Sequence, residues 1–174
     1  MNTYFLIAFM LCLVGYIFHT VFHFFEYRGF NFVESKIVEI FLTIFIGVGY
    51  LGWGFMIATD PVKMGLAKYV AIPLGLLFGL PGIVLFIFSA KAKKGFNELD
   101  YLVTKGIYSK IRNPMYLGIM LLHIGFPLVS RSLLTLISAV LWIPLILLWK
   151  YMEEKLLESK FGDKYSEYKK RTIF

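Results

Sequence analysis

Two polar blocks in the second half of the chain carry the residues best suited to chemistry. The first block, residues 91–118, reaches Arg112-Asn113-Pro114 immediately before an apolar run. Proline suits the first turn of a helix, where its missing N–H is not needed. The unpaired N–H groups of a helix start bind anions, and the guanidinium of Arg112 adds a fork of donors. The pattern predicts a site for an anion such as a carboxylate.

The second block, residues 150–171, contains the adjacent carboxylates Glu153 and Glu154, which we expect just past the last apolar helix. Each polar residue also has a simpler interpretation. Arg112 can extend toward lipid headgroups, and the two glutamates can be the solvated face of a surface helix. An interfacial aromatic belt would account for three further residues of the block, Phe161, Tyr165 and Tyr168.

A helical hairpin is expected to bring the two blocks together. The apolar runs 115–130 and 132–149 lie between them and are separated only by Arg131. A hairpin returns both of its polar ends to the same membrane face, so Arg112 should meet the glutamate pair. The resulting pocket would combine a cation, a helix start, two carboxylates and several tyrosines. Such a pocket suits a zwitterionic polar ligand beside a lipidic one.

The composition places these blocks in a membrane protein. Of the 174 residues, 59% are hydrophobic and 17% are charged, whereas soluble domains carry about 25% charged residues. This balance excludes a disordered chain, and the single cysteine, Cys12, excludes an intrachain disulfide. Too little polar side chain is present to cover a soluble globule.

Charge-free runs predict the membrane helices. Besides the hairpin, the uncharged runs are residues 3–25, 40–59 and 69–90, each about 30 Å or more when helical. The prediction is an all-α polytopic membrane protein with about five transmembrane helices, the last two forming the hairpin. The domains would be a three-helix transmembrane region, 1–90, and a membrane hairpin with a cytoplasmic C-terminal helix, 91–174.

Basic residues predict the orientation in the membrane. Fifteen of the 18 Lys and Arg residues fall in segments 26–36, 91–113 and 150–174, which share one side of a five-helix arrangement. The positive-inside rule then places the N-terminus outside, with the C-terminus and the polar site at the cytoplasmic face. The net charge of +7 thus reflects orientation in the bilayer, and no nucleic acid partner is expected.

Glycine, proline and histidine within the spans raise further possibilities. Gly75 and Gly79 have the spacing that permits close helix packing, within one chain or between two, so the oligomeric state stays open. A glycine-lined path for a lipid tail is the alternative. Each of three prolines is expected to kink or end a helix: Pro81, Pro127 and Pro144. His19 and His23 share a helix face, but without a third ligand we expect packing and no metal site.

The two blocks resemble the signatures of a known enzyme family. The first reads Leu102-Val103-Thr104-x-Gly106-x-Tyr108-x-x-x-Arg112-Asn113-Pro114-x-Tyr116-x-Gly118. The second reads Glu153-Glu154-x-x-Leu157-x-x-x-Phe161-Gly162-x-x-Tyr165-x-x-Tyr168-x-x-x-Thr172. In this order, around an apolar hairpin, they are similar to the isoprenylcysteine carboxyl methyltransferases, integral-membrane enzymes related to the phospholipid methyltransferases. The resemblance covers about residues 99–172.

The resemblance implies a methyltransferase that uses S-adenosylmethionine and acts on a lipophilic acceptor. Arg112 or nearby backbone N–H groups would take the methionyl carboxylate, and Glu153 or Glu154 the amino group or ribose hydroxyls. Arg112 and Glu154 are the candidate catalytic residues. The candidate cofactor-binding residues are Tyr108, Arg112, Asn113, Pro114, Tyr116, Leu117, Glu153 and Glu154.

Two positions depart from the family pattern. Asn113 stands where the family often has histidine, so a proton-shuttling role there is not expected. Asp100 stands where the prenylcysteine enzymes tend to have histidine. The acceptor therefore stays open among a prenylcysteine carboxylate, an isoprenoid or thiol, and a lipid amine. The alternatives are an NADPH-dependent sterol or steroid reductase, which has a similar Arg-x-Pro-x-Tyr-x-Gly passage, and a membrane protein without enzymatic activity.

Overall fold

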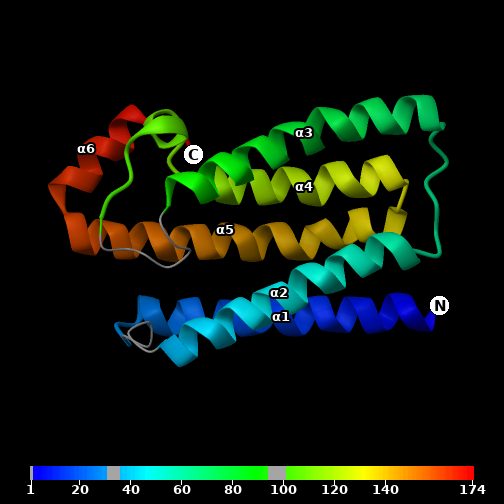
Figure 1. Cartoon of the computed structure of the whole chain (residues 1–174), viewed down its shortest axis with the longest axis horizontal. Coiled ribbons are helices and arrows are strands. Elements are labelled where there is room, and N and C mark those ends of the chain that lie inside the picture. Colours follow the sequence, from blue (N-terminus) through cyan, green and yellow to red (C-terminus); the bar gives the residue numbers. More distant parts are fainter. Residues whose placement is uncertain (1, 31–35, 94–100) are drawn as a thin grey trace.

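Every regular element is a helix within the residues that the computed structural model describes, namely 2–30, 36–93 and 101–174 (Figure 1). In chain order the elements are α1 (Thr3–Tyr27), α2 (Lys36–Thr59), α3 (Lys68–Ala92), the 3-10 turn η2 (Gly106–Ser109), α4 (Pro114–Ser130), α5 (Leu133–Phe161) and α6 (Asp163–Arg171). The predicted all-α class is confirmed.

Five of these helices form the membrane bundle. Four of them, α1, α2, α3 and α5, are long and apolar enough to cross a bilayer, and α4 is a shorter apolar helix of 17 residues. Large apolar side chains cover the outside of the bundle, and Leu77 and Val140 are 67% and 74% exposed. A surface of this kind requires lipid around it, so the predicted polytopic membrane protein is confirmed.

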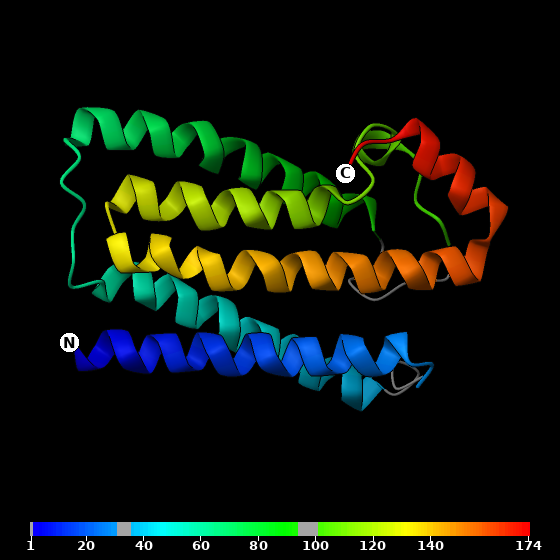
Figure 2. The ribbon, with the colours of Figure 1, turned by 180° about the vertical axis from the view of Figure 1, so that it is seen from behind.

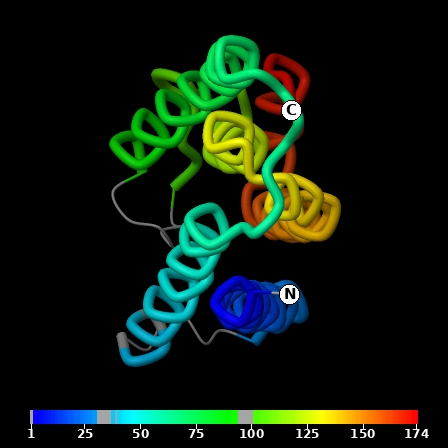
Figure 3. The backbone as a smooth tube through the Cα atoms, turned by 90° about the vertical axis from the view of Figure 1, so that its right-hand side faces the viewer, coloured from blue at the N-terminus to red at the C-terminus, as the bar shows by residue number. Residues whose placement is uncertain are grey.

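The bundle consists of two close helix pairs joined by α5. An end view shows α1 beside α2, α3 beside α4, and α5 between the pairs (Figure 3). Trp142 and Trp149 of α5 are almost fully buried, and both lie near Tyr16 of α1. The core is therefore centred on α5, the helix that also carries the glutamate pair.

Glycine allows each pair to pack closely, as the sequence predicts. A Cβ atom added at Gly75 would lie 2.6 Å from the backbone nitrogen of Val129, and one at Gly52 would lie 2.5 Å from that of Cys12. The Gly75 and Gly79 spacing thus serves contacts between α3 and α4 within one chain. Gly47 shows no such contact.

The hairpin forms as predicted, but one expectation about a helix end is wrong. α4 and α5 run antiparallel, and Arg131 between them has a left-handed φ of 58°. Pro81, Pro127 and Pro144 lie inside α3, α4 and α5, so none of them ends its helix, and a kink at each of them stays a prediction. Glu153 and Glu154 do not lie past the fifth helix, because α5 continues to Phe161 and ends only at Gly162.

Candidate functional site

The candidate site lies at the end of the bundle where α4 begins and α5 projects beyond it. A view from behind shows η2, α6 and the end of the chain gathered there, beside the last turns of α3 (Figure 2). Asn113 precedes the first residue of α4, Pro114, which occupies the first turn as predicted. Gly162 has a positive φ of 50°, which permits the abrupt turn from α5 into α6.

Glu154 is the centre of the first polar cluster. Its Oε1 accepts hydrogen bonds from Nε of Arg112 at 2.8 Å and from Nδ2 of Asn113 at 2.6 Å. Two ammonium groups lie farther away, Lys150 at 3.4 Å and Lys169 at 3.7 Å. The carboxylate is 7% exposed, so these cations offset the cost of burying its charge. The predicted meeting of Arg112 with the glutamate pair is confirmed for Glu154.

Glu153 is the centre of a second cluster one position earlier. Its Oε1 accepts from Nζ of Lys93 at 2.9 Å, and its Oε2 accepts from the Tyr116 hydroxyl at 2.6 Å. Burial lowers the pKa of the Lys93 ammonium, but the charge and hydrogen bond of Glu153 outweigh burial and leave that pKa above its usual value. Lys93 therefore stays charged at neutral pH. The sequence places Lys93 in the first block without singling it out.

The last residues of the chain pair with the segment before α4. The N–H of Arg112 donates to the carbonyl of Ile173 at 3.0 Å, and the N–H of Ile173 donates to the carbonyl of Lys110 at 3.0 Å. Asn113 also donates from Nδ2 to the carbonyl of Phe174 at 2.9 Å. The tail thus takes one of the backbone donors that the sequence predicts for an anion, while the Arg112 side chain reaches the carbonyl of Thr172 at 3.3 Å.

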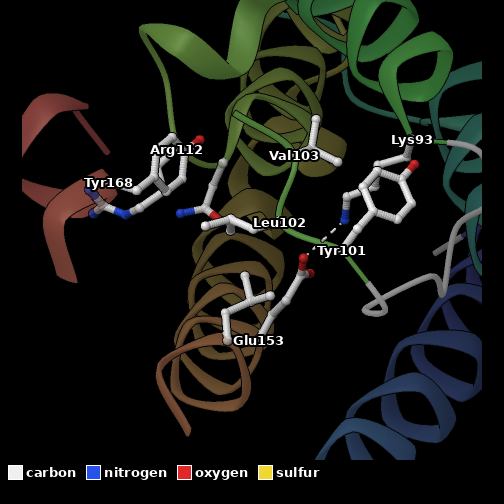
Figure 4. A pocket seen from close by; sticks show the side chains of 9 residues that line it. Lys93, Tyr101, Leu102, Val103, Arg112, Glu153 and Tyr168 are labelled. Atoms are coloured by element: carbon white, nitrogen blue, oxygen red, sulfur yellow. Dashed lines mark hydrogen bonds and ion pairs between the residues drawn. The ribbon is translucent and has the colours of Figure 1, made fainter. Parts of the chain in front are cut away.

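A small cavity opens between the two glutamate clusters (Figure 4). Its volume is about 30 Å³, which holds a water molecule or two. It is lined by Lys93, Tyr101, Leu102, Val103, Arg112, Asn113, Glu153, Leu157 and Tyr168. In the close-up, Arg112 and Tyr168 lie on one side of the cavity and Lys93 and Tyr101 on the other, with Leu102 between them and Glu153 below. Val103 and Leu157 are positions of the two signature blocks, although their apolar character alone does not mark them as lining residues.

Five of the predicted cofactor residues do not line the cavity, namely Glu154 and the four residues Tyr108, Pro114, Tyr116 and Leu117. Tyr108 in η2 is buried, and its carbonyl accepts a hydrogen bond from the Tyr168 hydroxyl at 2.7 Å. Pro114 and Tyr116 are buried in the first turn of α4. Leu117 packs against the hydrophobic core. Their roles in cofactor binding stay predictions, and Asp100 lies outside the described residues.

Tyr165 adds an unsatisfied polar group to the first cluster. It is fully buried on α6, and its hydroxyl has no hydrogen-bond partner within the part of the chain that the structure describes. Burial, followed by the charge of Glu154, raises the pKa of this phenol well above its usual range. The hydroxyl is therefore neutral and available to a ligand as donor or acceptor.

Comparison with known proteins identifies the family of this region. A family model described as phospholipid methyltransferase matches residues 75–164, slightly more than half of the chain. The protein-S-isoprenylcysteine O-methyltransferase of Schizosaccharomyces pombe is 36% identical over 81 residues, which make up 43% of this chain and 32% of that protein. The chain thus spans about a third of this relative's length. No solved structure matches.

Proposed function

The chain belongs to the phospholipid methyltransferase family, and from this premise we propose that it is an integral-membrane methyltransferase that uses S-adenosylmethionine. The acceptor would be a lipophilic molecule that reaches the site from the bilayer. The matched residues include Arg112 and both glutamates, so the polar clusters lie inside the family region. The arrangement that carries the proposal is a guanidinium, two carboxylates and an unsatisfied phenol at the end of a membrane bundle.

The residues present fit the donor's polar groups by charge and hydrogen bonding. Arg112 would hold the methionyl carboxylate, because a guanidinium matches a carboxylate with two parallel donors. Glu154 or Glu153 would hold the amino group or the ribose hydroxyls. The cavity is smaller than a nucleoside, so the residues that line it must separate when the donor binds. The tail at Ile173 and Phe174 is held by a few hydrogen bonds, so moving the tail would open the cavity at the smallest loss of contacts.

The donor supplies a methyl group activated on a sulfonium sulfur, and the protein supplies position. Arg112 and Glu154 would fix the donor at one end of the site. This positioning would increase the share of reactive orientations, and the bundle beside the site would exclude water. These groups need not exchange a proton with the donor. Removing either group should therefore weaken donor binding, while the pH dependence of the reaction should stay the same.

Calorimetry on the detergent-purified chain tests this proposal. S-adenosylhomocysteine should bind, and NADPH should not. Glu154→Gln and Arg112→Gln should each weaken S-adenosylhomocysteine binding at least tenfold. Glu158→Gln, one turn later on α5, is the matched control and should leave the affinity unchanged. NADPH binding alone would move the chain to the reductases, and unchanged affinity in folded Glu154 and Arg112 variants would refute the assignment of these residues.

We also propose that the site faces the cytoplasm, with the N-terminus on the opposite side. The support is the distribution of Lys and Arg residues, most of which fall at the end of the bundle that carries α6. Cysteines introduced at Lys164 and at Lys63 should react from opposite sides of sealed vesicles with a membrane-impermeant maleimide. Labelling of both from the same side would refute this orientation.

A further inference from the structure

The tail, formed by the last three residues of the chain, occupies hydrogen-bond donors that an anionic ligand would use. The carbonyl oxygens of Thr172 and Ile173 accept from Arg112, at 3.3 Å from Nη1 and at 3.0 Å from the backbone N–H. The carbonyl oxygen of Phe174 accepts from Nδ2 of Asn113 at 2.9 Å. Arg112 and Asn113 also line the cavity. Because carboxylate oxygens accept from the same donors, the tail lies where an anion would bind.

The tail is held mainly by its backbone and one ring. The side chain of Ile173 is 69% exposed, whereas its N–H donates to the carbonyl of Lys110 at 3.0 Å. The ring of Phe174 lies over Nζ of Lys150, 4.5 Å away, and packs against the hydrophobic core. Each backbone hydrogen bond contributes little net stability, because water replaces it when the tail leaves. The closed position of the tail is therefore only weakly stabilised.

The donors beneath the tail should bind a carboxylate better than they bind a carbonyl. The backbone N–H of Arg112 and Nδ2 of Asn113 are neutral, so their bonds to the tail join two neutral groups. The same donors bind an ionised oxygen about twice as strongly. Positive charge is also in excess, because Arg112 and Lys150 share the carboxylate of Glu154, at 2.8 Å and 3.4 Å. A ligand carboxylate is thus able to displace the tail.

We propose that the tail is an autoinhibitory latch, which occupies the subsite for the methionyl carboxylate and must leave before S-adenosylmethionine binds. This inference rests on the proposed function, in which Arg112 holds that carboxylate. Only molecules with an open latch bind the donor, so the apparent affinity is the intrinsic affinity reduced by the open fraction. Weakening the contacts of the tail therefore tightens donor binding. Removing a residue that holds the donor has the opposite effect.

Calorimetry with S-adenosylhomocysteine on the detergent-purified full chain tests the latch. Ile173→Pro removes the N–H that donates to Lys110, and Phe174→Ala removes the ring that packs on the core. Each variant should bind S-adenosylhomocysteine about fivefold more tightly than the wild type, which corresponds to one lost hydrogen bond or contact. The matched control is Arg171→Ala, because this side chain is 75% exposed and pairs only with Glu167 among the described residues. It should leave the affinity unchanged.

The outcomes separate the latch from the proposed function. If neither the wild type nor the two tail variants bind S-adenosylhomocysteine, the proposed function itself is refuted. If the wild type binds it and the tail variants bind it equally or more weakly, the latch alone is refuted, because the tail is then a wall of the site or has no influence on it. An equal gain in Arg171→Ala would also refute the latch, because any loosening of this region would then have the same effect.

Amide exchange measured by NMR follows the tail itself. In the closed position the N–H of Ile173 is bonded to the carbonyl of Lys110, and its signal in an isoleucine-labelled chain can be assigned with Ile173→Val. Saturating S-adenosylhomocysteine should speed exchange of this amide roughly tenfold, because the ligand releases the tail. The amide of Ile119, which is buried within α4, is the reference and should not change. Exchange at Ile173 that slows or stays constant while the ligand binds would overturn the latch.

Discussion

Removing the charge of Glu154 should strongly destabilise the protein. The side chains of Arg112 and Glu154 are 10% and 9% exposed, and Nε of Arg112 and Nδ2 of Asn113 both donate to the same carboxylate oxygen. Deleting one partner of a buried ion pair costs about 3–5 kcal/mol, because the other charge stays buried without compensation. Glu154→Gln keeps the volume and one acceptor oxygen, so we expect about 3 kcal/mol of lost stability.

The control lies one turn further along α5. Glu158 also accepts from two cations, Lys155 and Lys169, each at 2.7 Å, but its side chain is 26% exposed and Lys155 and Lys169 are more than 40% exposed. Exposed ion pairs contribute about 0–1 kcal/mol. Glu158→Gln should therefore change stability by less than about 1 kcal/mol. The hydrogen bonds of Glu154 and Glu158 have similar lengths, but those of Glu154 contribute more to stability because Glu154 is buried.

Thermal unfolding in detergent, followed by tryptophan fluorescence, measures both variants. At about 2–4 °C per kcal/mol for a chain of this size, Glu154→Gln should melt roughly 6–12 °C below the wild type. The double variant Arg112→Gln, Glu154→Gln should recover part of this loss, because the unpaired cation is gone. Melting of Glu154→Gln within 2 °C of Glu158→Gln, or a double variant less stable than Glu154→Gln alone, would refute the reasoning.

Three further predictions concern regions away from this ion pair. Oδ2 of Asp60 accepts from both N and Oγ1 of Thr135 at 2.8 Å, so Asp60→Ala should cost about 1–3 kcal/mol in the same melting assay, and unchanged melting would show that α5 needs no such cap. Gly52→Ala should separate α1 from α2 and lower the melting temperature, whereas Gly54→Ala, which meets nothing within 4 Å, should not; equal effects would contradict the close packing. Burial raises the pKa of Tyr168 to about 12, so stability present below pH 10 should fall as the pH rises toward 12, and tyrosinate absorbance that saturates by pH 11 would contradict it.

The features that the sequence predicts well are those fixed by local composition. Charge-free length determines the spans, and the single charged residue Arg131 between two apolar runs is enough to predict the hairpin that brings Arg112 to Glu154. The length of α5 was mispredicted because its apolar run ends at Trp149 while the helix continues. Good helix formers such as Leu and Lys extend it to Gly162, whose positive φ ends it.

The remaining features depend on how helices are placed around one another, which local patterns do not encode. The pairing of Ile173 with the segment before α4 joins residues that carry no polar signal. The approach of His19 and His23 to Trp149 depends on α1 packing against α5, and the periodicity of α1 is compatible with other neighbours. For this reason the sequence indicates packing histidines, while the structure adds which charged groups surround them.

The adjacency of the two glutamates explains why one short segment serves both clusters. Successive residues of a helix point about 100° apart, so Glu153 and Glu154 face different neighbours although they share a backbone. Glu154 faces Arg112 and Asn113 at the start of α4, while Glu153 faces Lys93 and Tyr116. Any movement of this turn of α5 therefore displaces both carboxylates and changes both clusters. A ligand that displaces the tail from Arg112 and Asn113 therefore acts beside the same turn of α5 that positions Glu153 near Lys93 and Tyr116.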